Sequence, residues 1–375
     1  MRYAGQSAGW GLARWVLGAA IVVGAVTMTV HADWTVVNLQ PAGATASYAL
    51  GVQGGQQVGY AGVSGYTHAS LWSGTAESWV DLNPPGAMLS DANSVYGGQQ
   101  VGEAAMVGGG AWHAGVWSGT AESWVDLNPA GAQSSNGVGV YGGQQVGSVI
   151  DAISGHPKAS LWSGSAASWV DLSPAGVVAS CAYGLDGGQQ VGRAAVGGTD
   201  HASLWSGTAA TWVDLHPAGA WGSRAWGVYN GQQAGYADVG GYYTEHASLW
   251  SGTAESWVDL NPAAATSSVA YGIYDGQQVG YAHVGGHDHA SLWNGSANSW
   301  VDLHLFLPSD FSSSTANDIW SDGLFTYVAG WGGGPATGYI PEALMWVSPV
   351  PEPASGLALA AALAAFSLLR RRRGA

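Results

Sequence analysis

The sequence predicts an all-β fold, a seven-bladed β-propeller, on three observations. A unit of about 45 residues recurs along most of the chain. Each copy contains four short strand candidates separated by turn residues. The array also begins and ends at complementary points of the unit. Four strands in about 45 residues are typical of one propeller blade, so we expect seven such blades.

Three elements define the repeat and keep a constant order. The first, Trp-Val-Asp-Leu, recurs every 43 or 45 residues after a weaker first copy, and it starts at Trp34, Trp79, Trp124, Trp169, Trp212, Trp257 and Trp300. The second, Gly-Gln-Gln, starts at Gly55, Gly98, Gly143, Gly188, Gly231 and Gly276. The third ends in a tryptophan, at Trp72, Trp117, Trp162, Trp205, Trp250, Trp293 and Trp346. The copies of these elements define seven units, of which the last is divergent.

The unit that starts at His246 shows the expected strands most clearly. Residues 270–274 and 277–282 flank Asp275-Gly276, a dipeptide that favours a type I′ hairpin turn. Residues 246–250 and 256–260 flank a longer polar loop. The proline that follows the last strand ends it, because proline has no N–H to donate to a sheet.

The two ends of the array predict a closed ring. The array begins with the strand at Trp34 and ends with the third strand of the last unit, residues 342–346. One blade would then take three strands from the C-terminal end and one from the N-terminal end, which removes exposed sheet edges. An open β-solenoid is the alternative, but its coils are shorter and its ends need not match.

Composition and charge narrow the function classes. The formal net charge is −15, and only Lys158, Arg193 and Arg224 carry positive charge between the two ends of the chain. Such a body repels phosphate backbones, so we exclude nucleic acid as a partner. The single cysteine, Cys181, excludes an intrachain disulfide, and we expect it to be a small buried side chain.

Residues 1–32 are predicted to be a secretory signal peptide. Arg2 and Arg14 provide a positively charged start, the stretch from Trp15 to Val30 is apolar, and cleavage is expected between Ala32 and Asp33. A retained membrane anchor is the alternative, but the apolar stretch is shorter than the roughly 20 residues that a spanning helix needs. The repeat domain is then expected at residues 33–349.

Residues 350–375 carry the most specific pattern of the chain. A polar motif, an apolar run over residues 357–369 and a basic cluster follow one another, with Val350, Pro351, Glu352 and Pro353 at the start and Arg370, Arg371, Arg372 and Arg373 at the end. The pattern predicts a short membrane helix. It resembles the PEP-CTERM sorting signal of Gram-negative bacteria. That resemblance implies recognition by an exosortase and transfer to the cell surface or extracellular matrix; a plain membrane tail is the alternative.

The repeat itself resembles a known bacterial extracellular repeat. His-Ala-Ser-Leu-Trp, Asp-Leu and Ala-Tyr-Gly-Ile…Gly-Gln-Gln-Val-Gly match the HAF repeat over about 300 residues. Serine replaces the phenylalanine that is usual in His-Ala-Phe-Leu-Trp. The family has no assigned catalytic residues, so the resemblance supports architecture and location only.

Histidines and aspartates recur too regularly to form one active site. The histidines are His68, His113, His201, His246 and His289, with Lys158 and Glu342 in the other units. The aspartates are Asp81, Asp126, Asp171, Asp214, Asp259 and Asp302. We interpret both sets as parts of the blades. His287-Asp288-His289 is the densest cluster of ligand types, with a metal there as the alternative. We expect no catalytic, cofactor or metal site.

Departures from the repeat are the better functional candidates, because a site has to break the symmetry. These candidates are Trp112, Trp221, Arg224, Trp226, Tyr242, Tyr243 and Trp331. Exposed aromatic rings with polar neighbours stack on sugars. Ordinary loop packing is the alternative for each of them.

The leading hypothesis is a non-enzymatic, exported propeller that binds exopolysaccharide or other matrix components through loops on one rim. The first alternative is an extracellular propeller enzyme, a hydrolase or lyase that acts on glycans. The second alternative is a purely structural matrix protein with no specific ligand.

Overall fold

A computed structural model of the chain describes residues 34–107, 110–241 and 244–350. The predicted signal peptide with its cleavage site at Ala32 and Asp33, both predicted apolar helices, Tyr242 and Tyr243 lie outside these residues. So does the predicted sorting signal from Pro351 onward. Within the described residues, no helix has the length and apolar character needed to cross a membrane.

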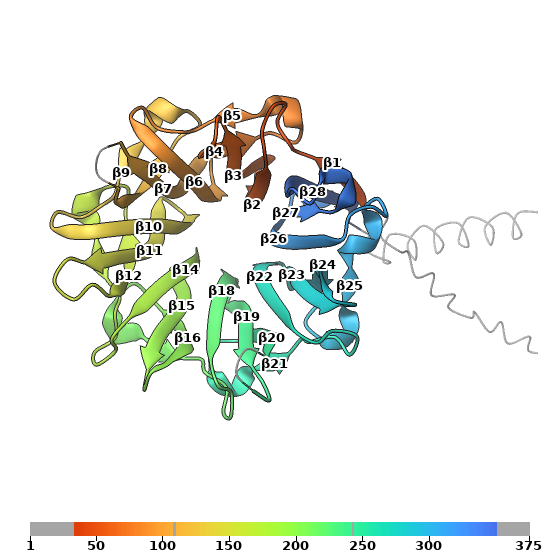
Figure 1. Cartoon of the computed structure of the whole chain (residues 1–375). Helices are drawn as coiled ribbons and strands as arrows, with labels where there is room; N and C mark the ends of the chain where they lie inside the picture. The colour runs from red at the N-terminus through yellow and green to blue at the C-terminus, as the bar shows by residue number, and fades with distance from the viewer. Residues whose placement is uncertain (1–33, 108–109, 242–243, 351–375) are drawn as a thin grey trace, which may run out of the picture. The chain divides into compact units, whose positions relative to one another are not determined.

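Seven four-stranded antiparallel sheets are arranged around a central axis, as the sequence predicts (Figure 1). Blade 1 consists of β2 (Ser47–Gln53), β3 (Gln56–Val63), β4 (Tyr66–Trp72) and β5 (Val80–Asp81). Blade 2 consists of β6 (Ala87–Tyr96), β7 (Gln99–Met106), β8 (Trp112–Trp117) and β9 (Val125–Asp126). Blade 3 consists of β10 (Ala132–Tyr141), β11 (Gln144–Asp151), β12 (Pro157–Trp162) and β13 (Val170–Asp171). In each blade the first strand is innermost.

Blades 4 to 6 repeat this order. Blade 4 consists of β14 (Ser180–Asp186), β15 (Gln189–Val196), β16 (Thr199–Trp205) and β17 (Val213–Asp214). Blade 5 consists of β18 (Ser223–Tyr229), β19 (Gln232–Asp238), β20 (Glu245–Trp250) and β21 (Val258–Asp259). Blade 6 consists of β22 (Ser268–Tyr274), β23 (Gln277–Val284), β24 (His287–Trp293) and β25 (Val301–Asp302). Two short 3-10 helices, η7 (Leu303–Phe306) and η8 (Pro335–Thr337), precede the strands β26 and β28 of blade 7.

Blade 7 is assembled from both ends of the described chain, which confirms the predicted closure. It contains β26 (Ser313–Ser321), β27 (Phe325–Gly333) and β28 (Glu342–Pro349), with β1 (Thr35–Asn38) as its outer strand. β1 pairs antiparallel with β28, so that Val36 lies opposite Trp346 (Figure 1). The ring therefore closes through main-chain hydrogen bonds between segments that are remote in sequence.

The hairpin prediction is confirmed, whereas the fourth strand is shorter than expected. Asp275 and Gly276 both have positive φ angles, 46° and 79°, as a type I′ turn requires. The strand expected over residues 256–260 is only the two residues of β21. Ser256 accepts a hydrogen bond from the Ser251 N–H at 2.7 Å and donates to the Thr253 carbonyl at 2.6 Å. These bonds close a 3-10 turn, Ala254–Ser256, before the chain becomes extended.

One serine of each inner strand joins neighbouring blades. In blade 2 the Ser90 hydroxyl accepts a hydrogen bond from the Ala69 N–H of blade 1 at 2.9 Å. The same bond, at 2.9 or 3.0 Å, occurs at every junction, with Ser135, Ser180, Ser223, Ser268, Ser314 and, across the closure, Ser47 as acceptors. The closing junction is thus built like the other six.

The repeated apolar residues form the core between blades. The seven repeated tryptophans of the third strands are fully buried, as is the leucine after each Val-Asp strand. Cys181 is also buried, as predicted. The second glutamine of each Gly-Gln-Gln is buried and links two loops. For example, Gln278 Nε2 donates to the Gly276 carbonyl at 2.7 Å, and its Oε1 accepts from the Gly295 N–H at 2.9 Å.

The glycine that ends Gly-Gln-Gln-Val-Gly is required by a close approach between strands. A Cβ added at Gly280 would lie 1.8 Å from the carbonyl oxygen of Val269 on the neighbouring strand. The strand pairing is irregular at this level, between Ala270 and Gly272, which draws the two backbones together. The motif is therefore explained by packing.

Candidate functional site

The recurring histidines and aspartates bond within their own blades, as interpreted from the sequence. His246 Nδ1 lies 2.8 Å from Asp259 Oδ2, and Asp259 Oδ1 accepts a hydrogen bond from the Asn261 N–H at 2.8 Å. The same 2.8 Å pair recurs as His68–Asp81, His113–Asp126, His201–Asp214 and His289–Asp302. In blade 3, Lys158 takes the place of the histidine, with its Nζ 3.4 Å from Asp171.

The dense cluster at residues 287–289 is divided between two such pairs. Asp288 Oδ1 lies 2.8 Å from His283 Nδ1, while His289 belongs to the pair with Asp302. In the described part of the chain, no three His, Cys, Asp or Glu side chains are grouped so that they could hold a metal ion. Asp288 and His289 are therefore each engaged in a separate pair within blade 6.

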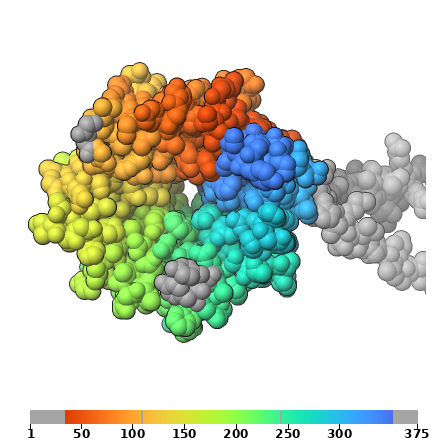
Figure 2. Space-filling model, viewed as in Figure 1, coloured from red at the N-terminus to blue at the C-terminus, as the bar shows by residue number. Residues whose placement is uncertain are grey.

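The symmetry is broken in the central channel. The seven inner strands surround a cavity of about 300 Å³ at the centre of the ring, where the surface is hollowed (Figure 2). One position of each inner strand faces this cavity. The residue before it in the sequence is small, and the residue after it is glycine in five blades. That position is occupied by seven side chains of different character, Leu50, Asn93, Val138, Tyr183, Trp226, Tyr271 and Asn317.

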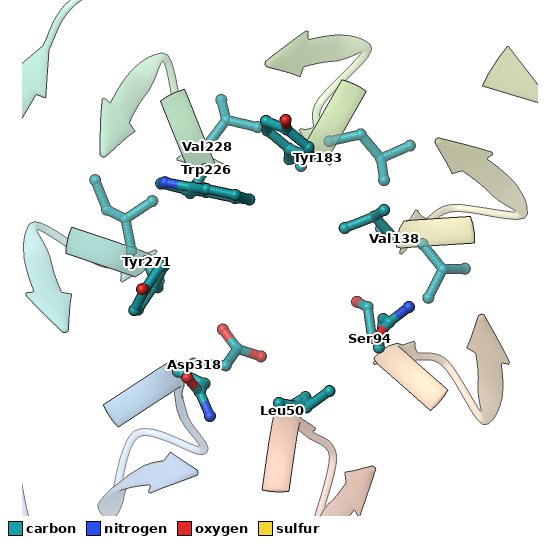
Figure 3. Close-up of a pocket in the computed structure, with 17 residues that line it drawn as sticks. Leu50, Ser94, Val138, Tyr183, Trp226, Val228, Tyr271 and Asp318 are labelled. Atoms are coloured by element: carbon teal, nitrogen blue, oxygen red, sulfur yellow. The ribbon is translucent and has the colours of Figure 1, made fainter. Parts of the chain in front are cut away.

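Blades 4 to 6 give the channel an aromatic wall. The rings of Tyr183 and Trp226 stack with centroids 4.2 Å apart, and Tyr271 meets Trp226 edge-on at 5.7 Å (Figure 3). Arg193 Nε donates a hydrogen bond to the Tyr183 hydroxyl at 3.1 Å and so fixes this ring. Burial raises the pKa of both tyrosines, which keeps them as neutral hydroxyls.

Blades 2 and 7 provide amide groups on the channel wall. Asn93 Nδ2 donates to the Gly137 carbonyl of blade 3 at 2.8 Å. Asn317 Nδ2 donates to the Ala49 carbonyl of blade 1, also at 2.8 Å. Both side chains are therefore held in place by the neighbouring blade. An amide that is fixed in this way still has a carbonyl oxygen to present to a ligand.

Asp318 adds a carboxyl group beside these amides. It stands where five other blades have glycine, and it lines the channel (Figure 3). Its Oδ2 accepts a hydrogen bond from the Val52 N–H of blade 1 at 2.9 Å, and its Oδ1 accepts from the Ile319 N–H at 2.9 Å. Burial raises the pKa of Asp318 to about 7, although both hydrogen bonds act in the opposite direction.

The channel continues toward the hairpin turns that join the first and second strands. An adjoining cavity of about 290 Å³ is lined there by Tyr96, Tyr141, Tyr229, Tyr274 and Trp320, among others. The rings of Tyr96 and Tyr141 lie 4.4 Å apart, and those of Tyr229 and Tyr274 lie 4.5 Å apart. Aromatic surface therefore extends along the channel.

The structure does not bring the predicted ligand-contact residues together in one site. Trp226 lies in the channel, whereas Trp221 and Arg224 line a separate cavity between blades 4 and 5. Trp112 begins β8, and Trp331 on β27 meets the Tyr48 ring edge-on at 5.4 Å. The prediction of exposed rings holds for Trp221 alone of the four tryptophans. The other three are partly buried; the rings of Tyr183 and Tyr271 lie against Trp226, and the ring of Tyr48 lies against Trp331.

Sequence reasoning missed most of the channel residues. Tyr183, Tyr271, Asn93, Asn317 and Asp318 look like ordinary members of the repeat until the units are aligned column by column. One column then varies freely beside a column that is glycine in five blades. This contrast is the signal that identifies the channel positions.

A pair of carboxyl groups was also missed. Asp91 on β6 lies directly opposite Glu103 on β7. Burial raises the pKa of Asp91 to about 6, while a hydrogen bond from Thr67 lowers it. Burial and the charge of Asp91 together raise the pKa of Glu103 to about 7. The two groups thus form a carboxyl pair. In the described part of the chain, none of the other six blades has two carboxyl groups at these positions.

No protein-family model matches the sequence, and the search of curated proteins gave no match. Solved structures do match. The β-propeller domain of the trilobed protease from Pyrococcus furiosus superposes with a TM-score of 0.53 and 9% identity, over 82% of this chain and 98% of that one. An acylaminoacyl peptidase from Pyrococcus horikoshii gives a TM-score of 0.52 and 9% identity, over 86% of this chain and 55% of that chain.

A prolyl endopeptidase gives a TM-score of 0.50 and 10% identity, over 83% of this chain. This chain spans about half the length of both peptidases, 51% and 55%. At such low identity the likeness concerns architecture and not activity. Together with the seven closed blades, it establishes that the described chain is a seven-bladed β-propeller.

Proposed function

We propose that this protein is an exported, non-enzymatic propeller of the cell surface or extracellular matrix, and that it binds a saccharide in its central channel. One observation carries the proposal. The channel position that differs from blade to blade places an aromatic wall, with Trp226 at its centre, in the same cavity as fixed amides and Asp318.

This combination suits a sugar ring. A pyranose has an apolar C–H face that packs on an aromatic ring, and hydroxyl groups at its edge that need hydrogen-bond partners. The carbonyl oxygens of Asn93 and Asn317 accept from such hydroxyls. Because both amides are already held by neighbouring blades, little conformational entropy is lost when a ligand binds.

The location rests on the sequence at the two ends. The charge and apolar pattern of residues 1–32 is typical of a signal peptide. The Val-Pro-Glu-Pro motif, apolar run and arginine cluster resemble a PEP-CTERM signal, for which the partner is an exosortase. The HAF-like repeat supports the same extracellular location. An exopolysaccharide of the matrix is accordingly the ligand class that we expect.

Binding of neutral matrix oligosaccharides to the full-length protein tests the channel. Trp226→Ala and Asn317→Ala should each weaken binding by roughly tenfold or more, since each removes a packing or hydrogen-bonding partner. Tyr66→Ala is the control, because this ring is 48% exposed and lies outside the channel lining. Unchanged binding in both channel variants would overturn the proposed site.

Export has its own test. Replacing Arg370, Arg371, Arg372 and Arg373 with alanine should leave the protein unprocessed and reduce the amount that reaches the cell surface. Cell fractionation with an antibody against the propeller measures both. Secreted protein that still carries the arginine tail would contradict processing by an exosortase.

The enzymatic alternative is favoured by one observation, the Asp91–Glu103 pair. Glycoside hydrolases use two carboxyl groups, one of which stays protonated near neutral pH. If the alternative holds, the protein releases reducing ends from a matrix polysaccharide, and Glu103→Gln abolishes that release. Glu77→Gln serves as the matched control in a surface turn. Saccharide binding without turnover supports the binding function instead.

A further inference from the structure

A third cavity, of about 390 Å³, lies between blades 4 and 5. Its lining includes Trp221, Arg224, Tyr236, Asp238 and Glu245. Among the described residues, none lines both this cleft and the channel cavity, so the cleft is a separate site. We call it the blade 4–5 cleft.

Asp238 is the side chain that distinguishes this cleft from the other blade junctions. The equivalent positions hold no carboxylate in any other blade; they are Gly62, Ala105, Ile150, Ala195, His283 and Gly333. Asp238 is only 9% exposed, yet its Oδ1 has no hydrogen-bond partner among the described residues. A buried carboxylate oxygen without a partner is costly, and a donor from a ligand removes that cost.

The backbone makes room for this carboxylate. Gly222 lies beside it, and a Cβ added there would be 2.8 Å from Asp238 Oδ2. The other blades have larger residues at this position, Ala46, Leu89, Ser134, Ala179, Ser267 and Ser313. The Asp238 carbonyl also accepts a hydrogen bond from the Trp221 N–H at 3.0 Å, which anchors the tryptophan next to the carboxylate.

The charges in the cleft leave an excess of negative charge. Asp200 receives Arg193 Nη1 at 2.6 Å and Arg224 Nη2 at 2.6 Å, so the two arginines are largely engaged with Asp200. Asp238 and Glu245 lie directly opposite each other on β19 and β20. Burial and the neighbouring Glu245 raise the pKa of Asp238 to about 6, against the effect of Arg224. A cation placed between these carboxylates relieves their repulsion.

Trp221 supplies the other half of the recognition surface. Its side chain is 56% exposed at the edge of the cleft. An indole ring packs against the C–H face of a pyranose and also attracts a nearby cation. A ligand that combines a sugar ring with a positive charge therefore fits both the ring and the carboxylates.

We infer that the blade 4–5 cleft binds an amino sugar with a free ammonium group, which Asp238 and Glu245 hold while the sugar ring lies against Trp221. This site is additional to the channel and does not depend on it. Its ligand differs from the channel ligand in charge, so the two sites can be tested separately.

Calorimetry with a short oligomer of glucosamine and the full-length protein tests the inference. Asp238→Asn keeps the shape but removes the charge, and it should weaken binding by roughly tenfold or more. Trp221→Ala, at an exposed position, should also weaken binding without endangering the fold. Asp288→Asn is the matched control, because Asp288 holds on β24 of blade 6 the position that Glu245 holds on β20, and it already pairs with His283.

The probes separate this site from the channel. N-acetylglucosamine oligomers lack the ammonium group and should not bind the cleft, so their affinity should be the same in wild type and Asp238→Asn. Trp226→Ala should leave glucosamine binding in place. Equal affinity of wild type and Asp238→Asn for glucosamine would overturn the inference. Binding of lysine peptides in preference to glucosamine would overturn it as well.

Discussion

The carboxylate of Asp318 in blade 7 accepts a hydrogen bond from the backbone N–H of Val52 in blade 1, at 2.9 Å. This bond spans the junction where the ring closes, and it lies in the channel. The same residue thus contributes to closure and to the proposed binding site. The protonation state of Asp318 therefore affects both the closing junction and the proposed binding site.

The first prediction concerns pH. The pKa of Asp318 is raised from 3.8 to about 7, so the folded protein holds a proton between about pH 4 and 7 that the unfolded chain has lost. Asp318 therefore contributes stability at low pH, and this contribution falls as pH rises through that window. In Asp318→Asn the contribution is absent. The difference in melting temperature, variant minus wild type, should therefore increase from pH 5 to pH 8.

Other carboxyl groups in the protein do not interfere with this comparison. Asp91, Glu103 and Asp238 are shifted in the same direction but are present in both proteins. Parallel pH curves for wild type and Asp318→Asn would show that Asp318 titrates normally.

The second prediction concerns ring closure. Leu39 follows β1 and is fully buried against blade 1, as Leu260 is buried in an ordinary blade junction. Leu39→Ala and Leu260→Ala should each lower the free energy of unfolding by about 2–5 kcal/mol, because each leaves a cavity in a packed core. Chemical denaturation measures both. A negligible loss for Leu39→Ala alone would mean that the N-terminal strand is not part of the closed ring.

The third prediction concerns the glycine of the repeat. Gly280→Ala should lower stability by several kcal/mol, since its Cβ would meet the Val269 carbonyl at 1.8 Å and the strands would have to separate. Gly241→Ala is the control, because among the described residues the nearest atom to a Cβ there is the Thr244 Oγ1, at 3.6 Å. Thermal melts of the two variants should differ clearly; similar melts would refute the close approach.

The fourth prediction concerns the histidine–aspartate pairs. His246→Ala should cost roughly 1–2 kcal/mol of stability, because it removes the partner of Asp259, and it should leave saccharide binding unchanged. Lys158→His introduces the usual residue of the repeat opposite Asp171 and should be tolerated. Loss of binding in His246→Ala with unchanged stability would mean that the histidines serve a ligand.

The candidate site was only partly predictable from sequence. Trp226 and Arg224 were found because they depart visibly from the repeat. Tyr183 and Tyr271 were not, since a tyrosine inside Ala-Tyr-Gly looks like a regular strand residue. Which side of a strand faces the channel depends on register, and a local irregularity such as the one between Ala270 and Gly272 changes it by one residue.

The sequence by itself determined the number of blades, their four strands and the closure of the ring. These features follow from local turn chemistry and strand patterns that recur every 43 or 45 residues, so each copy supports the others. The tertiary structure alone decided which of the irregular residues meet. Trp221 and Trp226 are five residues apart in the chain but lie in different cavities, whereas Trp226 and Asn317 line the same one. Contacts of this kind arise from the arrangement of blades around an axis, which no local pattern records.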